Sequence, residues 1–68
     1  MTSVKIIILS HLSDITEMLG QNQDAEIQNR INFIKYLTLN NIDQSIKVDA
    51  DIEYANYNHL IKSLEISI

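Results

Sequence analysis

The stretch QDAEIQNRINFIKYLTLN, residues 23–40, carries the strongest structural signal in this sequence. Four side chains recur along it at helical spacing, and they are Ile27, Ile31, Ile34 and Thr38. Phe33 and Leu37 form a second apolar patch, about 100° around the same helix. Asn40 and Asn41 suit a helix end. The pattern therefore predicts a helix over residues 23–40 that has two apolar faces.

The segment before this helix also shows helical spacing. Its apolar residues repeat at helical intervals, and they are Val4, Ile8, Leu12, Ile15 and Leu19. Gly20 follows, where a left-handed residue commonly ends a helix, and Asn22 is a good N-cap for the next one. These features favour a helix over residues 3–19. The alternative is a β-strand near residues 4–9, because that run is rich in β-branched side chains.

The last third of the chain carries two overlapping patterns. The helical pattern is the longer one, and it comprises Ala50, Tyr54, Tyr57, Ile61 and Leu64. Asp49 is a good N-cap, and Asp51 and Glu53 would lie in the positively polarised first turn of a helix. We therefore expect a helix over residues 50–66. The rival pattern is alternation over residues 45–54 and again over 63–68, which is typical of two short strands.

Composition agrees with long helices in a single domain. The chain has 68 residues, enough for one small domain over residues 1–68. Proline is absent and glycine occurs once, whereas folds of many strands need these residues in their turns. The predicted fold class is all-α, a three-helix arrangement. The alternative is a small α+β domain with strands near residues 4–9, 45–54 and 63–68.

The side chains that catalysis would need are few and scattered. Cysteine is absent, so the chain has neither a thiolate nucleophile nor a thiolate metal site. His11 has Asp14 three residues after it, but two ligands are too few for a zinc site. The second histidine, His59, has no such neighbour, and no serine lies in a nucleophile turn of the type G-x-S-x-G. One glycine cannot build a loop that cradles phosphate.

An acidic cluster near residue 50 is similar to the start of a calcium-binding loop. That loop requires glycine at its sixth position and glutamate at its twelfth, where this chain has Tyr54 and Leu60. The cluster is explained more simply as the first turn of a helix. We therefore expect no catalytic residue, no metal site and no cofactor, and a protein that is not an enzyme.

Net charge and hydropathy narrow the range of partners. The formal charge is −4 and the isoelectric point is near 4.8, so the chain repels phosphate and we do not expect it to bind nucleic acid. The longest apolar run, Ile6 to Leu9, is far shorter than the ~20 residues that a membrane-spanning helix needs. The N-terminal residues lack the pattern of a signal peptide. We expect a cytoplasmic protein.

Small size gives the chain a reason to bind a partner. A core of this size leaves little surplus stability, and no disulfide adds to it. We therefore expect a homo-oligomer, most simply a homodimer, that covers one apolar face of the helix over residues 23–40. The residues of the candidate interface are Ile27, Ile31, Phe33, Ile34, Leu37, Tyr54 and Tyr57.

These observations favour a small acidic interaction protein, such as a regulator, inhibitor or adaptor that occupies the surface of a partner protein. Its size, acidity and composition would also suit an accessory protein of a phage. One alternative is an oligomeric protein that binds a small ligand in a pocket between subunits. Another is a DNA mimic, whose acidic surface would occupy the basic groove of a DNA-binding protein.

The charge distribution yields a first prediction. The protein should show no measurable binding to duplex DNA at about 150 mM salt, because an acidic chain without a concentrated basic patch gains too little from counterion release. Fluorescence anisotropy with a labelled duplex measures this directly. Sequence-independent binding in the micromolar range would contradict the prediction.

Overall fold

The computed structural model describes the backbone of residues 1–67 and the side chains of residues 1–64. Within these residues it has three helices, α1 (Val4–Met18), α2 (Asp24–Asn40) and α3 (Ala50–Ser67). Two short strands, β1 (Thr2–Ser3) and β2 (Lys47–Val48), complete the order β1-α1-α2-β2-α3. The predicted all-α, three-helix arrangement is confirmed.

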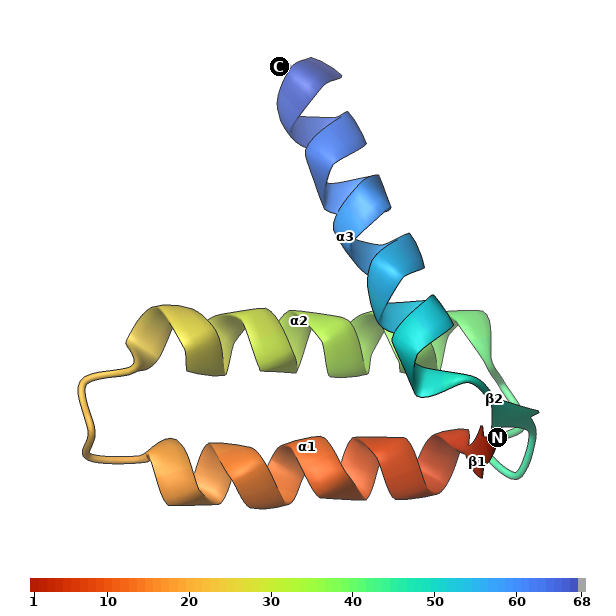
Figure 1. Ribbon diagram of the computed structural model, residues 1–68, viewed down its shortest axis with the longest axis horizontal. Coiled ribbons are helices and arrows are strands. Elements are labelled where there is room, and N and C mark those ends of the chain that lie inside the picture. Colours follow the sequence, from red (N-terminus) through yellow and green to blue (C-terminus); the bar gives the residue numbers. More distant parts are fainter. Residues whose placement is uncertain (68) are drawn as a thin grey trace.

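Helices α1 and α2 form an antiparallel hairpin, and α3 crosses it at a steep angle (Figure 1). The connection between α1 and α2 contains Gly20 at φ +85° and Asn22 at φ +55°, so both residues adopt left-handed backbone conformations. The predicted helix end at Gly20 is confirmed. The predicted N-cap at Asn22 is wrong: Gln23 holds that position and its side chain caps no backbone N–H. Asparagine tolerates the left-handed region better than most residues, so the turn uses Asn22 for its backbone.

Of the strands predicted by the rival patterns, the described residues contain only one short strand, β2, which pairs with β1. Thr2 and Ser3 pair antiparallel with Val48 and Lys47, which makes a two-stranded sheet beside the start of α1. Residues 4–9 are helical, and so are residues 50–54 and 63–67; residue 68 lies outside the described residues. The Val4 N–H donates to the Ile46 carbonyl at 2.9 Å, so this segment satisfies a donor that the first turn of α1 leaves free.

Helix α3 begins as its sequence predicts. The Asp49 side-chain oxygen Oδ1 accepts hydrogen bonds from the backbone N–H groups of Asp51 at 3.0 Å and Ile52 at 3.2 Å. This is the geometry of an N-cap, and it ends the alternating pattern at residue 48. The competition between strand and helix over residues 45–54 is therefore decided by Asp49.

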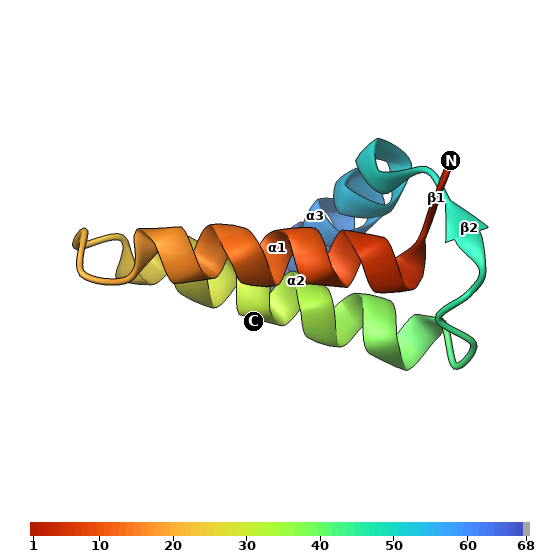
Figure 2. The same cartoon turned by 90° about the horizontal axis from the view of Figure 1, so that it is seen from below.

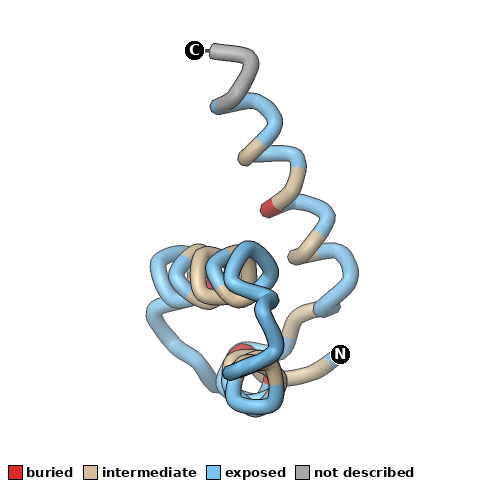
Figure 3. The backbone as a smooth tube through the Cα atoms, turned by 90° about the vertical axis from the view of Figure 1, so that its left-hand side faces the viewer, coloured by how far each residue is buried: buried red, intermediate tan, exposed pale blue. Residues whose placement is uncertain are grey.

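The core lies where α3 crosses the hairpin. Its buried side chains come from all three helices, and they are Val4, Ile7, Phe33, Leu37 and Tyr57. The Phe33 ring is the centre of this core: its centroid lies 5.1 Å from that of His11 on α1, and 5.0 and 5.4 Å from those of Tyr54 and Tyr57 on α3. Burial is concentrated at this crossing, and the far half of α3 extends beyond α2 (Figure 3).

The position of Phe33 and Leu37 corrects one prediction. These side chains are 1% and 0% exposed, so the patch they form is not free to pack on a second copy. Helix α2 is the middle element, and α1 and α3 approach it from different directions, so one chain covers a patch that was expected to need another. Tyr57, also predicted to lie in an interface, is buried in the same core.

The exposed face of α1 also differs from the simplest expectation. The buried residues of this helix are Val4 and Ile7, whereas Leu12 and Leu19 of the predicted apolar stripe are 46% and 63% exposed. The stripe is apolar, but only the residues along one of its edges are buried in the core. The remaining part of the stripe faces outward.

The core yields a prediction that compares two leucines of α2. Leu37→Ala should lower the melting temperature by at least about 10 °C, because removing a fully buried leucine side chain costs ~2–5 kcal/mol. Leu39→Ala should change it by only a few degrees, because Leu39 is 81% exposed. Thermal unfolding followed by circular dichroism at low micromolar concentration measures both. Equal effects of the two substitutions would place the core elsewhere.

Candidate functional site

The hairpin has two sides, and α3 covers only one of them (Figures 2 and 3). On α2, the side toward α3 is marked by Asn29, whose side chain bonds Tyr54 of α3, and the side toward α1 by Arg30, which reaches Asp14. Successive residues of α2 are rotated by about 100° around the helix axis. A rotation in the direction that leads from Asn29 to Arg30, continued past Arg30, reaches the isoleucines. The side chains found there are Ile34, Ile27, Thr38 and Ile31. They therefore lie on the side of the hairpin that faces away from α3.

Helix α1 contributes a matching stripe. It runs antiparallel to α2. Ile7 of α1 is buried in the core and His11 contacts the Phe33 ring, and turning from them in the direction away from α3 leads to a second apolar set that begins with Ile8 at the edge of the core. Together the two stripes form what we call the outer face, which comprises Ile8, Leu12, Ile15 and Leu19 of α1 and Ile27, Ile31, Ile34 and Thr38 of α2. These residues are half-buried or exposed in the single chain. An open, mostly apolar hollow of about 360 Å³ lies at one end of it, lined by Ile34, Lys35, Thr38 and Leu39.

The seven residues predicted for an interface thus separate into two groups. Ile27, Ile31 and Ile34 lie together on the outer face, joined by a stripe of α1 that the interface prediction did not include. The aromatic and leucine members lie in or beside the core, and they are Phe33, Leu37, Tyr54 and Tyr57. The helical period of α1 was visible in the sequence, but its outward direction depends on which side of the hairpin α3 takes.

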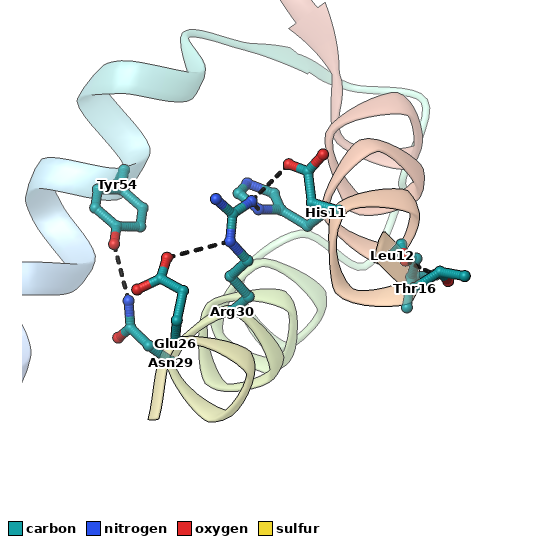
Figure 4. Close-up of polar contacts among 8 residues, drawn as sticks. His11, Leu12, Thr16, Glu26, Asn29, Arg30 and Tyr54 are labelled. Atoms are coloured by element: carbon teal, nitrogen blue, oxygen red, sulfur yellow. Dashed lines mark hydrogen bonds and ion pairs between the residues drawn. The ribbon is translucent and has the colours of Figure 1, made fainter. Parts of the chain in front are cut away.

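A polar network joins α1 to α2 beside the core (Figure 4). Arg30 lies at its centre: one guanidinium N–H donates to Asp14 Oδ2 at 2.6 Å, and Nε–H donates to Glu26 Oε1 at 3.2 Å. The same terminal nitrogen lies 3.2 Å from His11 Nδ1. Since arginine only donates, His11 Nδ1 is the acceptor, and this contact requires an imidazole that is unprotonated at Nδ1.

Burial and charge agree with that protonation state. Partial burial lowers the pKa of His11 from its usual 6.5, and the Arg30 guanidinium lowers it further, while Asp14 and Glu26 act in the opposite direction. The imidazole also packs on the Phe33 ring in a T-shaped arrangement, with the ring planes at 81°. His11 therefore links the charged network to the aromatic core.

A second polar contact holds α3 on α2. The Asn29 side-chain amide donates to the Tyr54 hydroxyl at 2.8 Å, and the Tyr57 hydroxyl donates to Asn29 Oδ1 at 3.4 Å. Burial is the main cause of a raised pKa at Tyr57. One asparagine thus meets two tyrosines one helical turn apart, which sets the register of α3 along α2.

The polar side chains of these two networks bind one another, which limits the catalytic chemistry that they could perform. His11 contacts the Arg30 guanidinium and the Phe33 ring, and neither of these groups is a nucleophile that an imidazole could activate. Beside this network lies an open polar hollow of about 350 Å³, lined by Asp14, Glu17, Met18, Gln21, Gln23 and Arg30. Among residues 1–64, whose side chains are described, no three His, Cys, Asp or Glu side chains come close enough to hold a metal ion. Nor does any helix of this part of the chain have the length and apolar character to cross a membrane.

The role of Arg30 was not predicted from the sequence. A signal for it exists in the numbering of the hairpin: Asp14 and Arg30 are equidistant from Asn22, and so are His11 and Phe33. Residues placed symmetrically about the turn of an antiparallel hairpin come opposite each other, so the observed contacts follow from the position of the turn. No protein-family model, curated protein or solved structure matches this chain.

The His11 network predicts a pH dependence of stability. The pKa of His11 is lower in the folded chain than the usual 6.5, so the unfolded chain binds more protons between the two values. The free energy of unfolding should therefore be constant above about pH 6.5, where His11 is neutral in both states. It should fall as the pH drops from about 6.5 toward the pKa of His11 in the folded chain. Urea unfolding at several pH values between about 5.5 and 7.5 measures the slope.

Two variants isolate the histidine responsible. His11→Gln should flatten this slope, because it removes the titrating group while keeping an acceptor for Arg30. His59→Gln is the matched control, on exposed α3 surface, and should keep the slope. A slope that persists in His11→Gln would assign the pH dependence to other groups.

Proposed function

We propose that this chain is a small, acidic, non-enzymatic cytoplasmic protein that works by binding a partner protein through its outer face. The single observation that supports this most is the outer face itself. Two helices of one hairpin present parallel apolar stripes on the side that α3 leaves open, and among these residues Ile8 also packs against the core. Contiguous exposed apolar surface of this kind is a feature of interaction sites.

The polar groups support the same conclusion by their engagement with one another. Arg30, Asp14, Glu26 and His11 form a closed set of contacts, and Asn29 is shared between two tyrosines. Such networks hold helices in register. They provide no set of unpaired, converging groups of the kind that would orient a substrate.

The small size of the chain suits a protein that acts by covering part of a partner protein's surface. A hairpin of two helices presents a rigid, elongated face, and recognition through such a face reads apolar side chains at helical spacing along a partner's groove or helix. Regulators, inhibitors and adaptors can act this way with no chemistry of their own. Partner binding by Ile31 and its neighbours would also explain why these apolar side chains stay on the outside of a chain with so small a core.

The test compares two substitutions of the same type. Ile31→Lys places a charge in the middle of the outer face, and Ile52→Lys places one on α3, where Ile52 is 59% exposed. Cross-linking in the native host, followed by titration of the purified partner, should show binding that the Ile52→Lys variant keeps and that Ile31→Lys weakens at least tenfold. Circular dichroism confirms that both variants fold. A partner that binds the two variants equally would contradict the proposal.

A further inference from the structure

The outer face has features that select one occupant, a second copy of this chain. This inference rests on the proposed function, since it names a partner for the same face. The observations that carry it are the dimensions of the face, the distribution of charge along the hairpin, and the symmetry that follows from both.

The dimensions suit a second two-helix layer. Helix α1 has 15 residues and α2 has 17, so at 1.5 Å per residue the face is about 22–25 Å long. Two packed helices are about 18–20 Å wide, which gives each copy a footprint of about 400–500 Å². Two such faces bury about 800–1,000 Å² in total, which lies among weak, transient interfaces and corresponds to a weak dimer.

Charge along the hairpin is polarised from one end to the other. Lys5 and Lys35 lie at the end where α1 begins and α2 finishes, and both are exposed; the loop that follows α2 adds one exposed acidic residue, Asp43, at this end. At about 100° per residue both lie at the rim of the outer face. Asp24 lies at the rim at the other end, beside the turn, and Glu17 lies at that end as well. The acidic first turn of α3 is on the opposite side of the hairpin layer (Figure 3).

This polarity chooses between the two ways in which two hairpins can stack face to face by two-fold symmetry. If the axis runs along the helices, turn lies over turn and like charges meet. If the axis runs across the helices, the turn of one copy lies over the open end of the other, so Lys35 approaches Asp24 of the second copy. The second arrangement also places α2 against α2 in antiparallel orientation, with the middle of α2, near Ile31, at the axis.

From these observations we infer that two copies of this chain pack through their outer faces, with antiparallel α2 helices crossing near Ile31, to form a symmetric dimer with a four-helix core. Leu12 lies at the corresponding midpoint of α1, so the two stripes meet their own copies in the same way. The interface is isologous, as in most soluble homodimers. The Phe33 core stays within each chain.

Sedimentation velocity on the full chain over about 1–200 μM is the first test. The wild type should show a concentration-dependent dimer with a dissociation constant in the micromolar range. Ile31→Lys should weaken the dimer at least tenfold, while Ile52→Lys should leave it unchanged. A wild type that remains a monomer at about 200 μM, or an Ile31→Lys dimer as tight as wild type, would overturn the inference.

Charge exchange tests the orientation without touching the apolar residues. Lys35→Glu should weaken the dimer about two- to fivefold at low salt, and Lys35→Glu combined with Asp24→Lys should recover the lost affinity. Because the chain has no cysteine, Ile31→Cys alone should also cross-link to its own copy under mild oxidation, while Ile52→Cys should not. Failure of both the charge recovery and the cross-link would contradict the antiparallel arrangement.

The outcomes separate this inference from the proposed function. A wild type that stays monomeric but loses a host partner on Ile31→Lys refutes the dimer and leaves the proposed function standing. A dimer that Ile31→Lys dissociates, together with partner binding that Ile31→Lys leaves unchanged, supports the dimer and refutes the proposed use of the outer face for another protein.

Discussion

Phe33 is the residue on which the arrangement of the three helices depends. Its ring meets His11 from α1 and two tyrosines from α3 at centroid separations of 5.0–5.4 Å. Aromatic pairs at such separations are worth ~0.5–1.5 kcal/mol beyond the area they bury. Five apolar side chains are buried among residues 1–64, so these contacts are a large part of what distinguishes one packing from another. They require α3 to cross α2 at this ring, and they leave the far side of the hairpin uncovered.

The uncovered side has a measurable effect on the dimensions of the molecule. Its accessible surface is 5001 Å², against about 4,400 Å² for a compact protein of this mass. Its radius of gyration is 12.6 Å, against about 11 Å for a compact chain of this length. Both differences follow from a hairpin with one open face and from an α3 that extends past α2 (Figure 1). The large aromatic residues gather at one crossing, whereas three isoleucines of α2, Ile27, Ile31 and Ile34, lie outside the core.

Much of this fold could be predicted from the sequence because its signals are local. The helical spacing of residues 23–40, the left-handed Gly20 and the Asp49 cap each depend on neighbours along the chain, and each was identified. The roles of the two apolar faces of α2 could not be assigned in the same way, because spacing shows that Phe33 and Ile31 point in different directions without showing which direction α3 takes. That choice depends on the aromatic contacts of Phe33 and on Asn29 bonding Tyr54 and Tyr57 across a wide sequence separation. The Arg30 network is of the same kind, since it forms only once the turn brings α1 opposite α2.

The three helices are held together only if the surroundings of Phe33 belong to its own chain. A nuclear Overhauser experiment on an equimolar mixture of isotope-labelled and unlabelled protein tests this most directly, because it separates contacts within a chain from contacts between chains. The account predicts strong contacts from the Phe33 ring to the rings of His11, Tyr54 and Tyr57 in the uniformly labelled sample, and their absence from the spectrum that selects contacts between chains. Contacts of Phe33 that appear between chains, or no contact between Phe33 and the tyrosines of α3 in either spectrum, would contradict it.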